Sequence, residues 1–171
     1  ITQAPALTYQ DSLRDHSVDG QGEWNGTIVP GTMQWVFDAE HPDTVTAAGD
    51  SEYKLEFVPD DTAHYVSVIV TPTFTAGKRE IAKPEIPAQT YAGRLLQAAV
   101  AQSSRYTVTD DSYTDAGTHY VTLTLTDADN TRWPDGDAAA TTVPFVINRA
   151  RLTRTGTLTL GNIAYGQKFL T

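Results

Sequence analysis

Several aspartates lie close together in predicted loops of this sequence, and their carboxylates are candidate ligands for a metal ion. In the segment DADN, Asp127 and Asp129 flank Ala128 and precede Asn130. Calcium takes roughly six to eight oxygen ligands, which loops of this kind can supply, so Asp127 and Asp129 are candidate calcium ligands. The segment only begins like a known ligand loop, and aspartates also form turns through local hydrogen bonds. We favour the turn-forming interpretation, which also covers the other loop aspartates, Asp60, Asp61, Asp110, Asp111, Asp115, Asp135 and Asp137.

The remaining side chains that could take part in catalysis form no known pattern. The four histidines, His16, His41, His64 and His119, lack the HxH or HExxH spacing of a zinc site. We expect His64 and His119, which lie beside strand tyrosines, at the surface. The sequence contains neither a GxSxG nucleophile motif nor a glycine-rich phosphate loop. We therefore expect no enzyme activity, no catalytic residue and no cofactor apart from the candidate calcium ion.

An exposed aromatic ring is the remaining way to build a ligand site here. Trp35 alternates with Met33 and Phe37, so we expect it in a core. Trp133 matches Tyr65 in the internal repeat described below, and we expect it in a core as well. Trp24, in GEWNG, has turn-forming neighbours. It is therefore the candidate ligand-contacting residue.

The overall composition narrows the class of partner. A net charge of −9 over 171 residues opposes binding to a phosphate backbone, so we expect no nucleic acid. No apolar run approaches the roughly 20 residues that a membrane helix needs, so we expect no membrane insertion within this segment. The absence of cysteine excludes disulfides and thiolate metal sites. Strand-like patterning begins at Ile1 without a signal peptide, and we expect the chain to be a fragment of a longer one.

The elements that must position these residues are repeated along the chain. PALTY at residues 5–9 returns as PAQTY at 87–91, which also aligns Leu13 with Leu95. Ala48-Gly49 returns as Ala116-Gly117, and this second alignment gives five further pairs. They are Tyr53 with Val121, Leu55 with Leu123, Phe57 with Leu125, Asp61 with Asp129 and Tyr65 with Trp133. NIAYGQKFL at 162–170, with Tyr165, opens a third copy. We predict a first copy at 1–78, a second copy at 79–150 and a partial third at 151–171.

Each copy is predicted to be all-β. Period-two alternation with one apolar face, as in SEYKLEF and YVTLTL, is typical of half-buried antiparallel strands. The inward residues are predicted to be Met33, Trp35, Phe37, Tyr53, Leu55, Phe57, Val121, Leu123, Leu125, Val143, Phe145 and Ile147. Residues 93–104 could form a short helix with one apolar face, but the internal repeat favours a strand there. Charges and prolines predict a linker over 75–87, and residues 148–156 form the second junction.

Four segments of the sequence resemble a known protein family. GTIVPGTMQWVFD, SEYKLEFVPDDTAHY, YTVTDDSYTDAGTHYVTLTLTDADNTRWPDGD and VPFVINRA resemble the tandem immunoglobulin-like, or YGX-type, repeats of large bacterial cell-surface proteins. IAYGQ at the third start has the usual YGX form, whereas the first copy reads Tyr9-Gln10-Asp11 and the second Tyr91-Ala92-Gly93. The resemblance covers nearly the whole chain. It implies a stalk or adhesin-like segment of an exported protein and transfers no catalytic residues.

The sequence therefore predicts two tandem small antiparallel β-sandwich domains of immunoglobulin-like type, with β-grasp-like repeats as the alternative fold. The expected function is a structural spacer, or stalk, in a secreted adhesin-like protein at a bacterial cell surface. The alternative is a binding module for a host or matrix glycan or protein, and an exposed apolar or aromatic patch would favour it. Neighbouring repeats of the same chain are further expected partners. The TLTL run at 157–160 is expected to pair with a strand edge of the second copy.

Overall fold

The computed structural model describes residues 1–153 and residue 156, and these residues form an all-β protein. Their only helical element is the 3-10 turn η1 (Leu13–Asp15). The helix considered for residues 93–104 does not form, and that segment contains the strand β11 (Leu96–Gln97). The TLTL run at 157–160 and Tyr165 of the predicted third copy lie outside the described residues.

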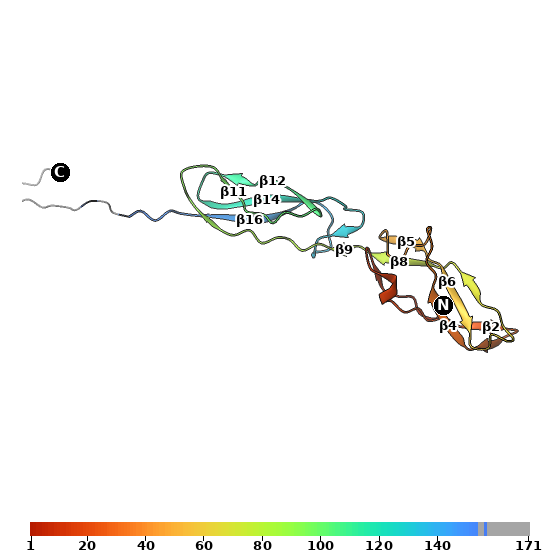
Figure 1. The fold of residues 1–171 in the computed structure, drawn as a ribbon. Helices are drawn as coiled ribbons and strands as arrows, with labels where there is room; N and C mark the ends of the chain where they lie inside the picture. The colour runs from red at the N-terminus through yellow and green to blue at the C-terminus, as the bar shows by residue number, and fades with distance from the viewer. Residues whose placement is uncertain (154–155, 157–171) are drawn as a thin grey trace, which may run out of the picture.

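The strands divide evenly between the two predicted copies (Figure 1). Those of the first copy are β1 (Leu7–Thr8), β2 (Gly22–Trp24), β3 (Thr27–Val29), β4 (Gly31–Trp35), β5 (Gly49–Glu52), β6 (Leu55–Pro59), β7 (Val68–Val70) and β8 (Thr73–Gly77). Those of the second copy are β9 (Arg79–Glu80), β10 (Gln89–Thr90), β11, β12 (Tyr106–Thr109), β13 (Ser112–Tyr113), β14 (Gly117–Leu125), β15 (Thr131–Arg132) and β16 (Thr141–Asn148).

The strands of the two copies correspond to one another. In the second copy the strand order is β10-β16-β14-β12. In the first copy the long strands are interrupted, so that β5 and β6 together correspond to β14, and β7 and β8 to β16. The register shows this, because Gly49 pairs with Ala76 as Gly117 pairs with Ile147. The first copy therefore has two three-stranded sheets, β1-β8-β5 and β4-β6-β7, where the second copy has one four-stranded sheet.

The repeated PA-x-TY motif has the same role in both copies. It forms β1 and β10, each of which runs along the end of the last strand of its copy. The N–H of Tyr9 donates to the carbonyl oxygen of Gly77 at 2.9 Å, and the N–H of Tyr91 donates to that of Asn148 at 2.8 Å. The two matching hydrogen bonds support the repeat that the sequence predicts.

Three strand pairs are parallel, whereas the sequence predicts an antiparallel fold. They are β1 with β8, β10 with β16, and β9 with β15. β1 is the first strand of its copy and β10 the second, and each pairs with the last strand, so nearly the whole copy forms the crossover that a parallel pair requires. Period-two alternation indicates which face of a strand is buried but not the direction of the neighbouring strand, and for this reason the sequence did not predict the parallel pairs.

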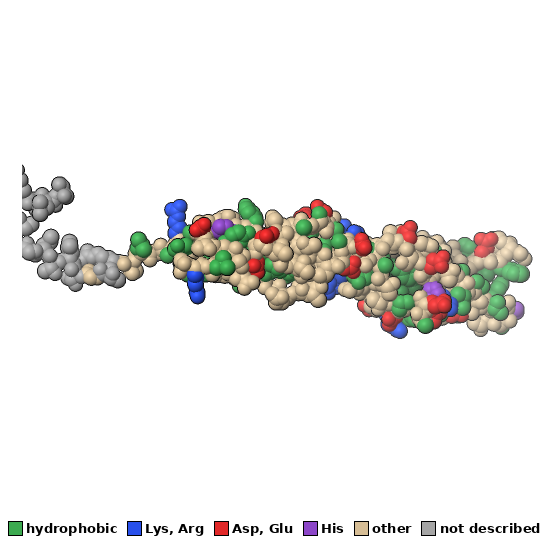
Figure 2. All heavy atoms as spheres, turned by 90° about the horizontal axis from the view of Figure 1, so that it is seen from above, with side chains coloured by type: hydrophobic (Ala, Val, Ile, Leu, Met, Phe, Trp, Pro, Cys, Tyr) green, Lys and Arg blue, Asp and Glu red, His purple; other side chains and the backbone are tan. Residues whose placement is uncertain are grey.

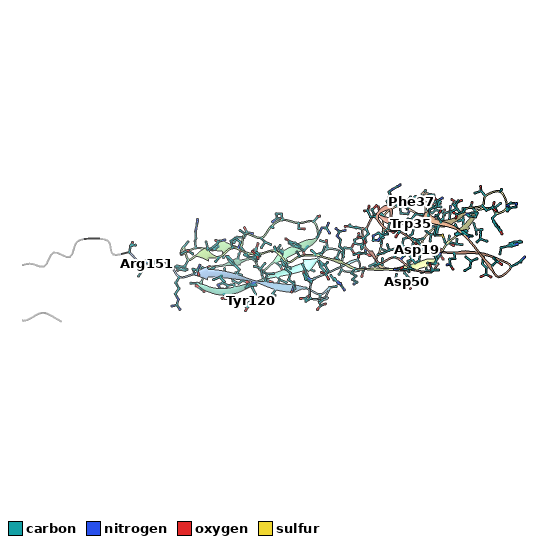
Figure 3. All side chains as sticks on the ribbon, turned by 90° about the horizontal axis from the view of Figure 1, so that it is seen from below. Asp19, Trp35, Phe37, Asp50, Tyr120 and Arg151 are labelled. Carbon is teal, nitrogen blue, oxygen red and sulfur yellow. The ribbon has the colours of Figure 1, made fainter. Side chains whose placement is uncertain are left out.

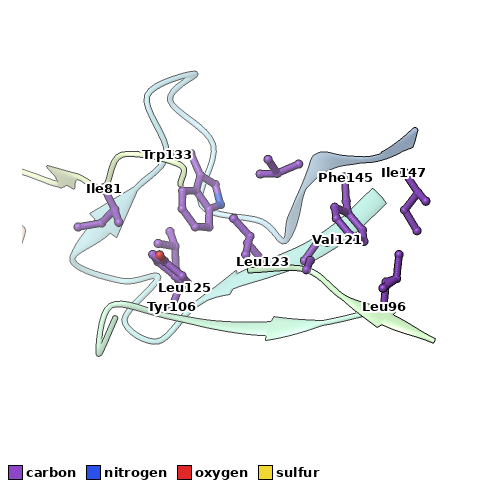
Figure 4. Close-up of a cluster of buried hydrophobic side chains, with 11 residues drawn as sticks. Ile81, Leu96, Tyr106, Val121, Leu123, Leu125, Trp133, Phe145 and Ile147 are labelled. Carbon is purple, nitrogen blue, oxygen red and sulfur yellow. The ribbon is translucent and has the colours of Figure 1, made fainter. Parts of the chain in front are cut away.

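Two separate clusters of buried side chains form the cores. The first consists of Leu7, Leu13, Val18, Val45, Tyr53, Leu55, Phe74 and Ala76, and Met33, Trp35 and Phe37 pack against it partly buried. The second consists of Ile81, Leu96, Ala98, Tyr106, Val121, Leu123, Leu125, Trp133, Val143, Phe145 and Ile147 (Figure 4). All strand residues predicted to point inward are buried or partly buried, so the predicted strand faces are confirmed.

The predicted linker at 75–87 is instead built into both copies. β8 ends at Gly77 and β9 begins at Arg79, so only Lys78 separates them. Ile81 is 4% exposed and belongs to the second core. The charges and prolines of this segment thus lie on a strand and an extended stretch that cover the second copy.

Two alignments predicted from constant spacing are wrong. Leu95, matched to Leu13, is 65% exposed. Ala98 takes that place, since its N–H donates to the carbonyl of Asp111 at 2.7 Å as the N–H of Leu13 donates to that of Asp43 at 2.8 Å. An insertion in one copy shifts the register, which a single anchor cannot reveal.

The second wrong alignment concerns the turn after the central strand. The N–H of Tyr65 donates to the carbonyl of Asp61 at 3.1 Å, and the N–H of Thr131 donates to that of Asp127 at 2.9 Å. Asp61 therefore corresponds to Asp127, and Tyr65 to Thr131. The predicted partners, Asp129 and Trp133, each lie two residues farther along the chain.

The two copies lie end to end (Figures 1 and 2). Across the joint, the N–H of Ala48 donates to Oδ1 of Asn130 at 2.8 Å, and Nζ of Lys78 donates to the carbonyl oxygen of Ala128 at 2.7 Å. The one-residue connection and these contacts between the copies restrict motion at the joint.

Candidate functional site

An apolar groove lies at the end of the first copy that points away from the second. Its volume is about 970 Å³. Its lining includes Ile1, Gly22, Glu23, Trp24, Val29, Met33, Phe57, Pro59, Asp61, His64, Tyr65, Val66, Val68, Val70 and Pro72. Hydrophobic side chains are visible on the surface at this end of the molecule (Figure 2). Trp24, the candidate ligand contact, thus lies in a groove of the size that binds ligands.

One wall of the groove is the β2–β3 hairpin. Its turn residues Asn25 and Gly26 have φ values of 48° and 79°, the positive values that a type I′ two-residue turn requires. Trp24 pairs with Thr27 beside this turn and is 61% exposed. At Gly22 an added Cβ would lie 2.4 Å from the ring of Phe57. Glycine therefore lets the hairpin lie directly on that ring.

This hairpin has no counterpart in the second copy. Leu13 corresponds to Ala98, as shown above, and Met33 corresponds to Tyr106, because each pairs with the matching residue of the central strand. Residues 14–32 of the first copy therefore correspond to only 99–105 of the second. The groove wall that carries Trp24 is thus an addition specific to the first copy.

The opposite wall is the strand β7 and Val66, which lies two residues before it. β7 pairs with β6 on one side and is an edge strand of its sheet among the described residues. All three of its residues are exposed, and Val66 is 84% exposed. At the matching positions the second copy has Ala139, Ala140 and Thr141. The first copy alone therefore presents an edge of large apolar side chains.

Polar groups hold the loop between β6 and β7, and two of them, Asp61 and His64, line the groove. Nδ1 of His64 lies 2.8 Å from Oδ2 of Asp61, in the turn before β7. Ser67 donates from Oγ to Oε1 of Glu56 at 2.6 Å, and Gln34 donates to Oε2 at 2.9 Å. These hydrogen bonds, that from Ser67 above all, lower the pKa of Glu56. An apolar floor with a polar rim suits recognition of an apolar surface.

The calcium candidates lie elsewhere, at the joint between the copies. Asp127 accepts hydrogen bonds from the N–H of Asn130 at 3.2 Å and from its Nδ2 at 3.0 Å, while Asp129 is exposed. Within residues 1–153 and 156, no three or more histidine or carboxylate side chains lie close enough together to hold a metal ion. The hydrogen bonds of Asp127 are those of a turn-forming aspartate.

The histidines and tryptophans differ in their surroundings. His64 is exposed as predicted, whereas His119 is only partly exposed, since its ring stacks on Tyr113 at 4.1 Å. Trp133 is fully buried and Trp35 partly buried. Figure 3 shows Trp35 and Phe37 in the first copy, and Tyr120 on the second.

Sequence reasoning missed the second wall of the groove. The signal was the run VSVIV at 66–70, which lacks both charge and period-two alternation. A strand that is apolar on both faces is either buried on both sides or exposed for another surface.

Comparison with protein-family models, with curated proteins and with solved structures found no match to this chain. No helix in the described part of the chain is long and apolar enough to cross a membrane.

Proposed function

We propose that this chain is a spacer segment, in which β-repeat domains are joined in series within a secreted adhesin-like protein at a bacterial cell surface. The observation that carries this proposal is the joint. Only Lys78 separates β8 from β9, and Asn130 and Lys78 bond across to the neighbouring copy. A short, cross-bonded connection holds the two copies end to end, as a stalk requires.

The repeat itself supports the same proposal. In each copy the strand formed by the PA-x-TY motif adds to the last strand of the same copy, so the two ends of a copy pair with each other. Such a unit can be added in series without changing its neighbours. Each copy is built from strands, with η1 as the one helical turn of the described residues, which fits small β-sandwiches. The short parallel strand β1 or β10 is an edge addition to the antiparallel strands.

Small-angle scattering tests the spacer. A compact domain of this length has a radius of gyration of ~15–16 Å, and a stalk gives a clearly larger value with an elongated distance distribution. A compact particle with the copies side by side would contradict the proposal.

The second candidate is a binding module for a host or matrix glycan or protein. The apolar groove with the exposed ring of Trp24 favours it, since aromatic rings at exposed apolar sites contact ligands. Screening the chain against glycans and matrix proteins, with Trp24→Ala as the matched variant, tests this candidate. Binding that survives the substitution would exclude the groove as the site.

A further inference from the structure

The groove of the first copy lies where an entering strand packs in the second copy. There, β9 pairs in parallel with β15, with Arg79 opposite Thr131 and Glu80 opposite Arg132. The next residue, Ile81, donates its N–H to the carbonyl of Arg132 at 2.9 Å. Its side chain enters the core together with Leu125 and Trp133 (Figure 4). The chain that enters the second copy thus completes both its backbone pairing and its core.

The corresponding backbone in the first copy has no such partner among the described residues. Tyr65 corresponds to Thr131 through the matching turns described above, so Val66 corresponds to Arg132. Both Tyr65 and Val66 line the groove. Phe57, which corresponds to Leu125, also lines it. The groove therefore contains the backbone and the apolar contact that β9 and Ile81 meet in the second copy.

The direction of the chain at Ile1 agrees with this correspondence. The alignment of PALTY with PAQTY, continued without a gap, places Ile1 at the position of Lys83. Nζ of Lys83 donates to Oγ1 of Thr141 at 2.9 Å. Val70 corresponds to Thr141, and Ile1 and Val70 both line the groove. The position that matches Ile81 is then the second residue before Ile1.

We propose that the groove accepts an extended segment of the type Lys-Arg-Glu-Ile-Ala, the sequence of residues 78–82, from the chain that leads into the first copy in an array. This inference rests on the proposed spacer function. The segment would pair in parallel with Tyr65 and Val66 and place its isoleucine on Phe57. Its two basic residues also match the rim carboxylates of Glu23 and Asp61. The groove is then an acceptor for the entering strand of its own copy.

The test joins Lys-Arg-Glu-Ile-Ala directly before Ile1 of the full chain. The matched control carries Lys-Arg-Glu-Asp-Ala, which keeps the length and the backbone but places a charge where the apolar side chain should enter. Amide hydrogen exchange at Val66 and the indole resonance of Trp24 report on the groove directly. With the isoleucine extension, we expect exchange at Val66 to slow by on the order of tenfold or more and the Trp24 resonance to shift. The aspartate extension should leave both unchanged.

Equal behaviour of the two extensions, or no change with either, would overturn the proposal. The proposal would also be overturned if a glycan or peptide slowed exchange at Val66 equally well in the original chain and in the isoleucine-extended chain. A groove that the extension already fills should exclude such a ligand. Scattering on the same samples keeps the two proposals apart. If the particle is elongated but Val66 exchange and the Trp24 resonance do not change, only the proposal that the groove accepts a strand is contradicted. If the particle is compact, the proposal that the chain is a spacer is contradicted.

Discussion

The N–H of Ala48 in the first copy donates to Oδ1 of Asn130 in the second copy at 2.8 Å. Nδ2 of the same amide donates to both carboxylate oxygens of Asp127, at 3.0 and 3.1 Å. Asp127 thereby orients the amide so that its oxygen faces the first copy. A turn residue of the second copy thus serves as part of the joint.

Asn130→Ala should loosen the joint without unfolding either copy, because it removes the bond to Ala48 and little buried surface. We expect each copy to lose about 1 kcal/mol or less. Residual dipolar couplings measure the effect. The two copies should share one alignment tensor in the original chain and diverge in the variant. Thr107→Ala, a change on the exposed side of β12, is the control and should keep one tensor. A shared tensor in Asn130→Ala would show that this bond does not fix the joint.

Leu123→Ala should destabilise the second copy by about 2–5 kcal/mol, because Leu123 is fully buried at the centre of the core. Thr122 lies on the opposite face of β14, where its Oγ1 donates to Asp110 at 2.8 Å. Thr122→Ala should cost less than half as much. Denaturant unfolding measures both. Equal losses would mean that the strand faces are reversed.

Expressed alone, residues 79–150 should be more stable than residues 81–150. The longer fragment keeps the pairing of β9 with β15 and the bond of 2.9 Å from Arg132 to Glu80. We expect a difference of about 1–2 kcal/mol in the free energy of unfolding. Residues 1–78 and 1–80 form the control pair and should unfold alike. If 81–150 is as stable as 79–150, then β9 does not contribute to the second copy.

The carboxyl of Asp135 should titrate below the usual range of aspartate. The hydrogen bond from Nζ of Lys83, 2.7 Å long, lowers its pKa. A lowered pKa in the folded state means that the pair stabilises the fold above the unfolded-state pKa and that this contribution is lost as the pH falls through the folded-state value. NMR titration of the original chain and of Lys83→Gln measures the shift. An unchanged titration in the variant would exclude Lys83 as the cause.

We expect no isopeptide bond between Lys83 and Asn148. Asn148 is exposed, as its phase in VPFVIN predicts. Lys83 bonds to Thr141 at the start of β16, whereas Asn148 ends that strand, so the two are separated by roughly 3.3 Å for each intervening residue. The intact mass should therefore equal the calculated mass. A deficit of about 17 Da, the mass of ammonia, would contradict this prediction.

The sequence by itself determined the β class, the repeat and the buried strand faces. Alternation at Leu55 and Phe57, or at Leu123 and Leu125, depends only on the period of a strand against one apolar surface. The recurrence of PALTY as PAQTY located the strand that pairs with the end of each copy. These features are local, and a single stretch of chain contains them.

The tertiary structure decided what lies beside each strand. Val68 and Ile81 are both apolar β residues, yet one is exposed on an edge and the other is buried under Trp133. Their difference depends on segments distant in sequence: a hairpin inserted only in the first copy, and an entering strand described only for the second. Parallel pairing, the joint at Asn130 and the groove arise in the same way. Each of these three features depends on which strand edges lie side by side. Long-range packing brings those strand edges together, and the local sequence pattern does not record it.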